Sequence, residues 1–133
     1  MRKYIISDTV KLYHVSRDSH DGEVFKPRVP DNRIEYEDDK VKRVCVSTSV
    51  IGALRGIACD DASGDYILHT PVNAGRKKIS DYIYKPTVNE LPDVIETREK
   101  WILCPVKMVE CGRVKIRNGK IAEILRKNER TEN

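Results

Sequence analysis

The sequence has few aromatic residues and no long apolar run. Aromatic side chains make up 6% of the 133 residues, with one Trp and one Phe. No apolar segment approaches the roughly 20 residues that a transmembrane helix requires. The first residues carry two basic side chains but no continuous apolar stretch before a small-residue cleavage site, so we expect no signal peptide. These absences predict a cytoplasmic protein without a membrane partner.

The cysteines lack the spacing of a metal site. The chain has four of them, widely separated, with no CxxC pair and no neighbouring His at ligand spacing. Cys45 and Cys104 lie within apolar runs, where a free thiol behaves as a small apolar side chain. We therefore expect reduced, structural thiols and no metal cofactor.

The charge is nearly balanced. The 25 basic residues exceed the 21 acidic ones by four, and both signs are interspersed. A nucleic-acid-binding protein more often shows a basic stripe with interleaved aromatics, whereas the basic run "GRKK" at 75–78 fits a solvated loop. The mild positive charge is compatible with a nucleotide ligand. The length fits one domain, which we place at 1–127 with a frayed tail at 128–133.

Apolar patterning predicts short strands separated by polar turns. Val44, Cys45 and Val46 are apolar on both faces, as in the centre of a sheet. Asn118-Gly119 is the preferred pair for a tight hairpin turn, although 120–127 fits either a strand or a short helix. The segments 24–33 and 73–100 read as irregular. The expected strands are 11–16, 43–47, 65–72 and 101–106, followed by the hairpin around 114–121.

A helix is expected directly after the 43–47 strand. Its apolar face repeats at helical spacing, and Ser49 stands where a hydroxyl caps the first turn. The apolar positions are Val50, Ile51, Leu54, Ile57 and Ala58. Together these elements predict an α+β single domain with a twisted, mostly antiparallel sheet and a few short helices.

Polar residues interrupt two of the apolar strands. On an extended strand His14 points to the face opposite Tyr13 and Val15, toward either a cleft or solvent. Helix capping explains Ser49 but does not explain Ser47, which shares a strand face with Cys45.

A third polar segment, "ETREKW" at 96–101, leads into a late apolar strand. Glu99 precedes Trp101 by two residues, so both side chains lie on one face of an extended strand. A carboxylate in that position can stabilise positive charge on a sugar while the aromatic ring covers a flat group. A solvated charged turn is the alternative interpretation of this segment.

The order of these segments resembles the ADP-ribosyltransferase superfamily. "LYHVS" is similar to its first strand, "CVSTS" with "VIGALRGI" to its second motif and helix, and "ETREKWILCP" to its acidic motif. Two residues rather than one separate the glutamates of that motif in this chain. The resemblance implies that NAD is the substrate and that Glu99 is the catalytic residue, gripping the nicotinamide ribose.

The same resemblance implies the rest of the NAD site. Ser47 orders the pocket and His14 contacts the adenosine ribose. The residues that flank these positions, Tyr13, Ser49 and Trp101, complete the expected pocket.

The chain also resembles a group of small phage and Firmicute proteins. The shared segments are "LYHVS", "F-x-PRVP", "RVCVS" and "E-x-W-x-L-x-PV", which together span about residues 12–114. This resemblance adds Arg28, which Pro27 and Pro30 hold in a stiff loop where a guanidinium either clamps a phosphate or lies at the surface. It implies the cytosol of a bacterium or of a phage-infected host.

Two functions are therefore expected. The first is NAD-dependent ADP-ribosyl transfer to a protein or nucleic-acid acceptor. The alternative is a non-catalytic module that binds a nucleotide or a host protein, which the altered glutamate spacing favours. RNA 2'-phosphotransfer onto NAD would need paired arginines for the phosphate that the sequence does not display.

Overall fold

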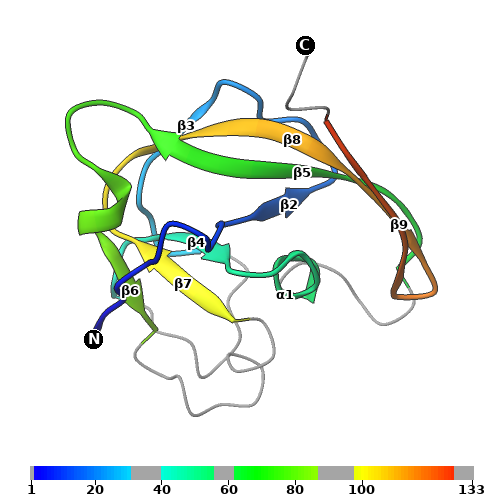
Figure 1. Cartoon of the computed structure of the whole chain (residues 1–133), viewed down its shortest axis with the longest axis horizontal. Coiled ribbons are helices and arrows are strands. Elements are labelled where there is room, and N and C mark those ends of the chain that lie inside the picture. The colour runs from blue at the N-terminus through cyan, green and yellow to red at the C-terminus, as the bar shows by residue number, and fades with distance from the viewer. Residues whose placement is uncertain (1, 31–39, 56–61, 87–97, 128–133) are drawn as a thin grey trace.

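The computed structural model describes residues 2–30, 40–55, 62–86 and 98–127. Within these ranges the chain forms antiparallel strands in two sheets, one short α-helix and one 3-10 turn (Figure 1). The elements are β1 (Arg2–Lys3), β2 (His14–Ser16), β3 (Val24–Phe25), β4 (Val44–Ser47), α1 (Val50–Arg55), β5 (Gly64–Asn73), η1 (Ile79–Asp81), β6 (Ile83–Lys85), β7 (Glu99–Ile102), β8 (Val106–Arg117) and β9 (Lys120–Arg126).

The strands pair in two antiparallel sheets. The first sheet has the order β1-β6-β7-β4, and the second has the order β2-β5-β8-β3, with β9 paired to β8. The longest ladder joins β5 to β8, and its register shifts at one point. Leu68 lies opposite Gly112 while His69 lies opposite Glu110, so Cys111 is an extra residue on β8 and forms a β-bulge.

The hairpin predicted at Asn118-Gly119 is confirmed. Both residues have positive φ, at 53° and 75°, as the favoured two-residue hairpin turn requires. The residues that follow continue as the strand β9 rather than as a helix. This assignment decides between the two structures that the sequence allowed for 120–127.

The two sheets are joined through the backbone beside β4. Tyr13 and Ser47 exchange hydrogen bonds of 2.8 and 3.0 Å, and Arg28 and Arg43 exchange two of 3.0 Å. Among the described strands, β4 is the last of its sheet, so the prediction of a central strand is corrected. Its apolar residues lie on both faces, as in a central strand, because all of its residues except the half-buried Cys45 are buried and because isolated bridges cover its second edge.

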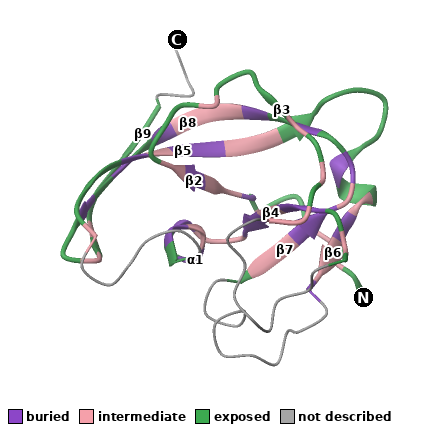
Figure 2. Ribbon diagram, turned by 180° about the vertical axis from the view of Figure 1, so that it is seen from behind, coloured by how far each residue is buried: buried purple, intermediate pink, exposed green. Residues whose placement is uncertain are grey.

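Two core clusters lie on different parts of the fold. The first core cluster is formed by Leu12, Val44, Val46, Ile79, Ile83, Ile102, Cys104, Val106 and Met108. The second core cluster is formed by Val15, Val50, Leu54, Tyr66, Leu68, Val114 and Ile116, and it joins α1 to the second sheet. Figure 2 shows the contrast between the largely exposed β9 and the buried parts of β4 and β7.

The predicted α+β class is wrong, because the described chain is mostly antiparallel β-sheet. Strand makes up 50% and helix 9% of it, in two sheets. In the part of the chain that the structure describes, helix is limited to the six residues of α1 and the three of η1. Strands β1, β3 and β6 are only two or three residues long, too short to show alternation in the sequence, and two of them lie in segments read as irregular.

The predicted helix is present, and its cap is confirmed. Ser49 Oγ accepts the backbone N–H of Gly52 at 3.0 Å, and α1 is described through Arg55. Its expected continuation to Ala58 and the tail at 128–133 lie outside the described residues. Among the described residues, no helix is both long and apolar enough to cross a membrane.

Candidate functional site

Five side chains gather on one face of the paired strands β4 and β7. In this antiparallel pair Ser47 lies opposite Glu99 and Cys45 lies opposite Trp101, and directly opposed residues share a sheet face. Arg43 stands two residues before Cys45 and therefore extends the same face. We call these residues, Arg43, Cys45, Ser47, Glu99 and Trp101, the β4–β7 cluster.

The carboxylate of Glu99 is held in place by Trp101. The indole Nε1–H donates a hydrogen bond to Glu99 Oε2 at 2.5 Å. Trp101 is only 1% exposed, which fixes the donor, while Glu99 itself is half-buried. The sequence prediction that this carboxylate stands beside the aromatic ring is confirmed.

Arg43 packs over the Trp101 ring. Its guanidinium carbon lies 4.2 Å from the centre of the Trp101 ring, a cation–π contact, and Arg43 Nη1 donates to the carbonyl of Val41 at 2.8 Å. The Arg43 side chain is 1% exposed. Trp101 thus contacts both a guanidinium and a carboxylate.

Cys45 remains a thiol at neutral pH. Burial and then the nearby Glu99 carboxylate raise the pKa of this thiol to about 12, and the positive charge of Arg43 offsets this only in part. A protonated thiol is a poor nucleophile. The chemistry available in the β4–β7 cluster therefore depends on Glu99 rather than on sulfur.

The hydroxyls that follow β4 have local roles. Ser47 Oγ accepts the backbone N–H of Ser49 at 3.1 Å, and Ser49 caps α1. Ser47 is 2% exposed and is bridged through its backbone to Tyr13. Ser47 therefore lies between Tyr13 and Glu99 across three adjacent strand segments.

His14 belongs to a different group. Because it follows Tyr13 along the strand, its side chain points to the opposite face. Its ring packs against His69 at 5.6 Å, Phe25 at 5.2 Å and His20 at 6.1 Å between ring centres. Burial, together with the two neighbouring histidines, lowers the pKa of His14 to about 4, so the ring is neutral at pH 7.

The structure thus divides the predicted site residues. Ser47, Glu99 and Trp101 are brought together, and Ser49 and the backbone of Tyr13 adjoin them. Arg28 is exposed and is bridged to Arg43 at the other end of β4. His14 is directed away from this group.

Two features of the site were missed from the sequence. Arg43 was not predicted to belong to the face that Cys45 and Ser47 share, although it alternates with them in "RVCVS", and that alternation was the available signal. The grouping of all three histidines had no such signal, because it depends on β2 pairing with β5 and on the fold of the following loop. Within the described residues, no group of His, Cys, Asp or Glu side chains is arranged to hold a metal ion.

Comparisons with models of protein families, with curated proteins and with solved structures found no match to this chain.

Proposed function

We propose that the chain binds NAD at the β4–β7 cluster and transfers ADP-ribose to a protein or nucleic-acid acceptor. The observation that carries the proposal is the position of the Glu99 carboxylate, opposite Ser47 and hydrogen-bonded to the Trp101 indole. The resemblance of the sequence segments to the ADP-ribosyltransferase superfamily supports the same reaction. The cytosol of a bacterium or of a phage-infected host is the compartment that goes with it.

The reaction requires the protein to position NAD and to stabilise the positive charge that develops on the ribose. The bond between ribose C1' and the nicotinamide nitrogen breaks, and nicotinamide leaves as a neutral molecule with the bonding electron pair. The ribose becomes positively charged, and the Glu99 carboxylate stabilises it. The acceptor then bonds to C1' and loses a proton, which completes the transfer.

The neighbouring residues have positioning roles in this proposal. Trp101 orients the carboxylate, Ser47 and Ser49 shape the backbone beside it, and Arg28 supplies positive charge for the phosphates. Tyr13 flanks Ser47 from the adjoining strand. His14 is left out of the reacting centre because its ring packs among His20, His69 and Phe25.

A non-catalytic binding module is the second candidate. It is favoured by the same hydrogen bond, because a carboxylate that accepts the indole N–H also serves to anchor Trp101 in the fold. The direction of His14, away from Glu99, favours it as well. In this case the chain binds a nucleotide or a host protein without turnover.

The experiment is nicotinamide release from NAD, measured by chromatography and compared with NAD binding measured by calorimetry. Glu99→Gln keeps an oxygen that accepts the indole hydrogen bond but removes the charge, so we expect release to fall on the order of 100-fold with little change in binding. Glu123→Gln, on the exposed strand β9, is the matched control and should be fully active.

The outcomes separate the candidates. Release by the wild type that Glu99→Gln leaves unchanged contradicts the catalytic role of Glu99. Binding of NAD or ADP-ribose without release supports the module. Absence of both rules out the NAD proposal.

A further inference from the structure

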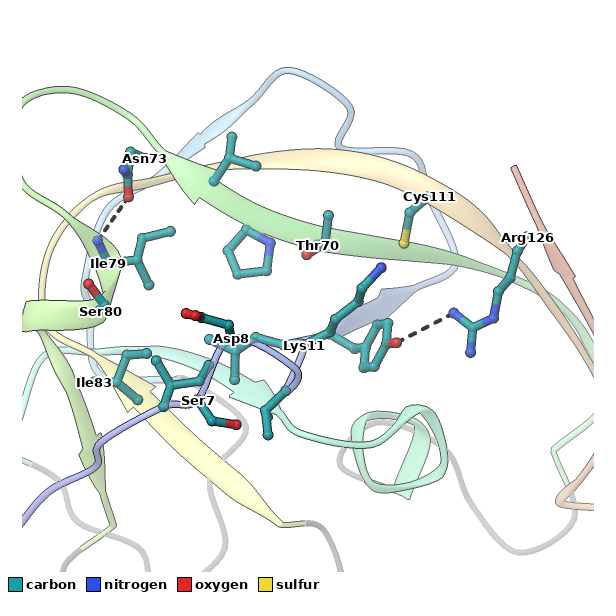
Figure 3. Close-up of a pocket in the computed structure, with 16 residues that line it drawn as sticks. Ser7, Asp8, Lys11, Thr70, Asn73, Ile79, Ser80, Ile83, Cys111 and Arg126 are labelled. Carbon is teal, nitrogen blue, oxygen red and sulfur yellow. Dashed lines mark hydrogen bonds between the residues drawn. The ribbon is translucent and has the colours of Figure 1, made fainter. Parts of the chain in front are cut away.

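A cavity of about 510 Å³ lies between the N-terminal segment and the second sheet. It is lined by residues 6–8 and 10–13, by the end of β5, by Ile79 and Ser80 of η1, and by single residues of β6, β8 and β9 (Figure 3). Binding sites for small molecules commonly have volumes of roughly 300–1,000 Å³. The cavity is therefore large enough for a small organic ligand, and none of the β4–β7 cluster lines it.

The floor of this cavity is apolar and belongs to the hydrophobic core. Leu12, Ile79 and Ile83 line it, and all three are buried members of the first core cluster. Pro71 of β5 adds a flat apolar surface. A floor made from the core offers an apolar or ring-shaped ligand body a preformed surface, so little ordering is needed on binding.

One end of the cavity carries positive charge. Lys11 and Arg126 line that end, and Arg126 Nη1 donates to the hydroxyl of Tyr13 at 3.5 Å. The Arg126 guanidinium also lies 5.6 Å from the centre of the Tyr13 ring. Figure 3 shows the Lys11 amine directed toward Thr70 and Cys111, on the same side as Arg126. The two cations come from segments far apart in the sequence.

The opposite end carries a single carboxylate. Asp8 is the one acidic residue among those that line the cavity, against two basic residues. Figure 3 shows its carboxylate directed toward η1, away from the Lys11 amine. The cavity therefore has a cationic end, an apolar floor and an acceptor at its far end.

We propose that this cavity binds a small organic anion. A phosphate or carboxylate group lies between Lys11 and Arg126, and an apolar or planar body lies over Leu12, Ile79 and Ile83. A hydroxyl or amine of the ligand donates to Asp8. This inference does not depend on NAD chemistry at Glu99.

The probe is 1-anilinonaphthalene-8-sulfonate, which joins an aromatic body to one anionic group and fluoresces when it leaves water. We expect one saturable site on the folded wild type at pH 7.5. The double variant Lys11→Gln, Arg126→Gln should raise the dissociation constant by about tenfold or more, because two charge-assisted contacts with the anion are lost. Both side chains are exposed, so the variant should fold, which circular dichroism verifies.

Matched controls test whether the effect is local. Lys115→Gln with Arg117→Gln removes the same charge from exposed positions of β8 outside the cavity and should leave binding unchanged. Glu99→Gln should also leave it unchanged, so failure of the NAD proposal and failure of this one are distinguishable. If AMP displaces the dye, the site binds a phosphate group; if benzoate displaces it, the site binds a carboxylate group.

Three results would overturn the inference. The first is a wild type that shows no saturable dye binding. The second is equal weakening in the two double variants, which would indicate attraction by net charge alone. The third is dye that neither AMP nor benzoate displaces.

Discussion

His14 should make the stability of the fold depend on pH below neutrality. The ring is enclosed by His20, His69 and Phe25, and the Nδ1 atoms of His14 and His69 are buried without a hydrogen-bond partner among the described residues. Protonation therefore places a charge on a ring that is largely removed from water and lies beside two other histidines. Burial is the main reason that the pKa of His14 falls to about 4, and the neighbouring histidines add to it.

The sign and size of the effect follow from the two pKa values. In the unfolded chain His14 binds its proton near pH 6.5, whereas in the folded chain it does so near pH 4. Between these values the unfolded state holds more protons, so the free energy of unfolding decreases as the pH falls. At 1.36 kcal/mol per pKa unit the full loss is about 3 kcal/mol, of which about 2 kcal/mol is reached by pH 5.

Other ionisable groups near this ring change the same curve in known directions. Burial also lowers the pKa of His69, so this residue adds to the loss at low pH. A hydrogen bond from Ser19 lowers the pKa of Glu110, so that carboxylate stays charged over most of the window. Asp21 also lies near His69, and Glu23 contacts His20 at 2.9 Å.

The assay is urea unfolding of the wild type and of His14→Phe at pH 7.5, 6 and 5. The variant removes one titrating group and keeps an aromatic ring, so the wild type should lose about 2 kcal/mol more than the variant between pH 7.5 and pH 5. NMR titration of the imidazole signals measures the pKa of His14 directly. Equal pH dependence of the two proteins, or a His14 pKa near 6.5, would refute the reasoning.

Three further predictions concern packing and reactivity. Gly112→Ala should lower the free energy of unfolding by about 1–3 kcal/mol, because a Cβ there would lie 2.5 Å from the carbonyl oxygen of Leu125, whereas Gly75→Ala, with no atom within 4 Å, should have little effect in the same urea titration. Ser49→Ala should cost about 1 kcal/mol in the same assay through loss of the α1 cap, and an unchanged midpoint would contradict the capping role. Cys45 should not react with a disulfide reagent at pH 8 until the chain is unfolded, because burial and Glu99 raise its thiol pKa to about 12; peptide mapping of the labelled protein checks this.

Local chemistry explains what the sequence predicted well. Ser49 and the apolar spacing after it specify a helix start within a few residues, and Asn118-Gly119 specifies a hairpin by its backbone preference. Glu99 and Trp101 lie on one face because of strand alternation alone. Each of these predictions needed only neighbours in the chain.

Pairing between distant segments explains what the sequence did not predict. Strands of two or three residues, such as β3 and β6, form because they pair with β8 and β7, and their own residues carry no pattern that predicts this pairing. The same holds for His14: alternation showed that it leaves the face of Tyr13, but only the β2–β5 pairing shows that it meets His69. The expected convergence of His14 with Glu99 required that long-range information.

The bulge at Cys111 has a consequence for the whole architecture. Along a regular strand all even-numbered residues share one side, so Val106 and Val114 would lie together. One supernumerary residue inverts that parity midway along β8, which sends Val106 into the first core cluster and Val114 into the second. Deleting Cys111 would restore regular alternation along β8. The side chains on one side of the deletion would then point to the opposite face of the sheet, so the separation of the two hydrophobic interiors depends on this one inserted residue.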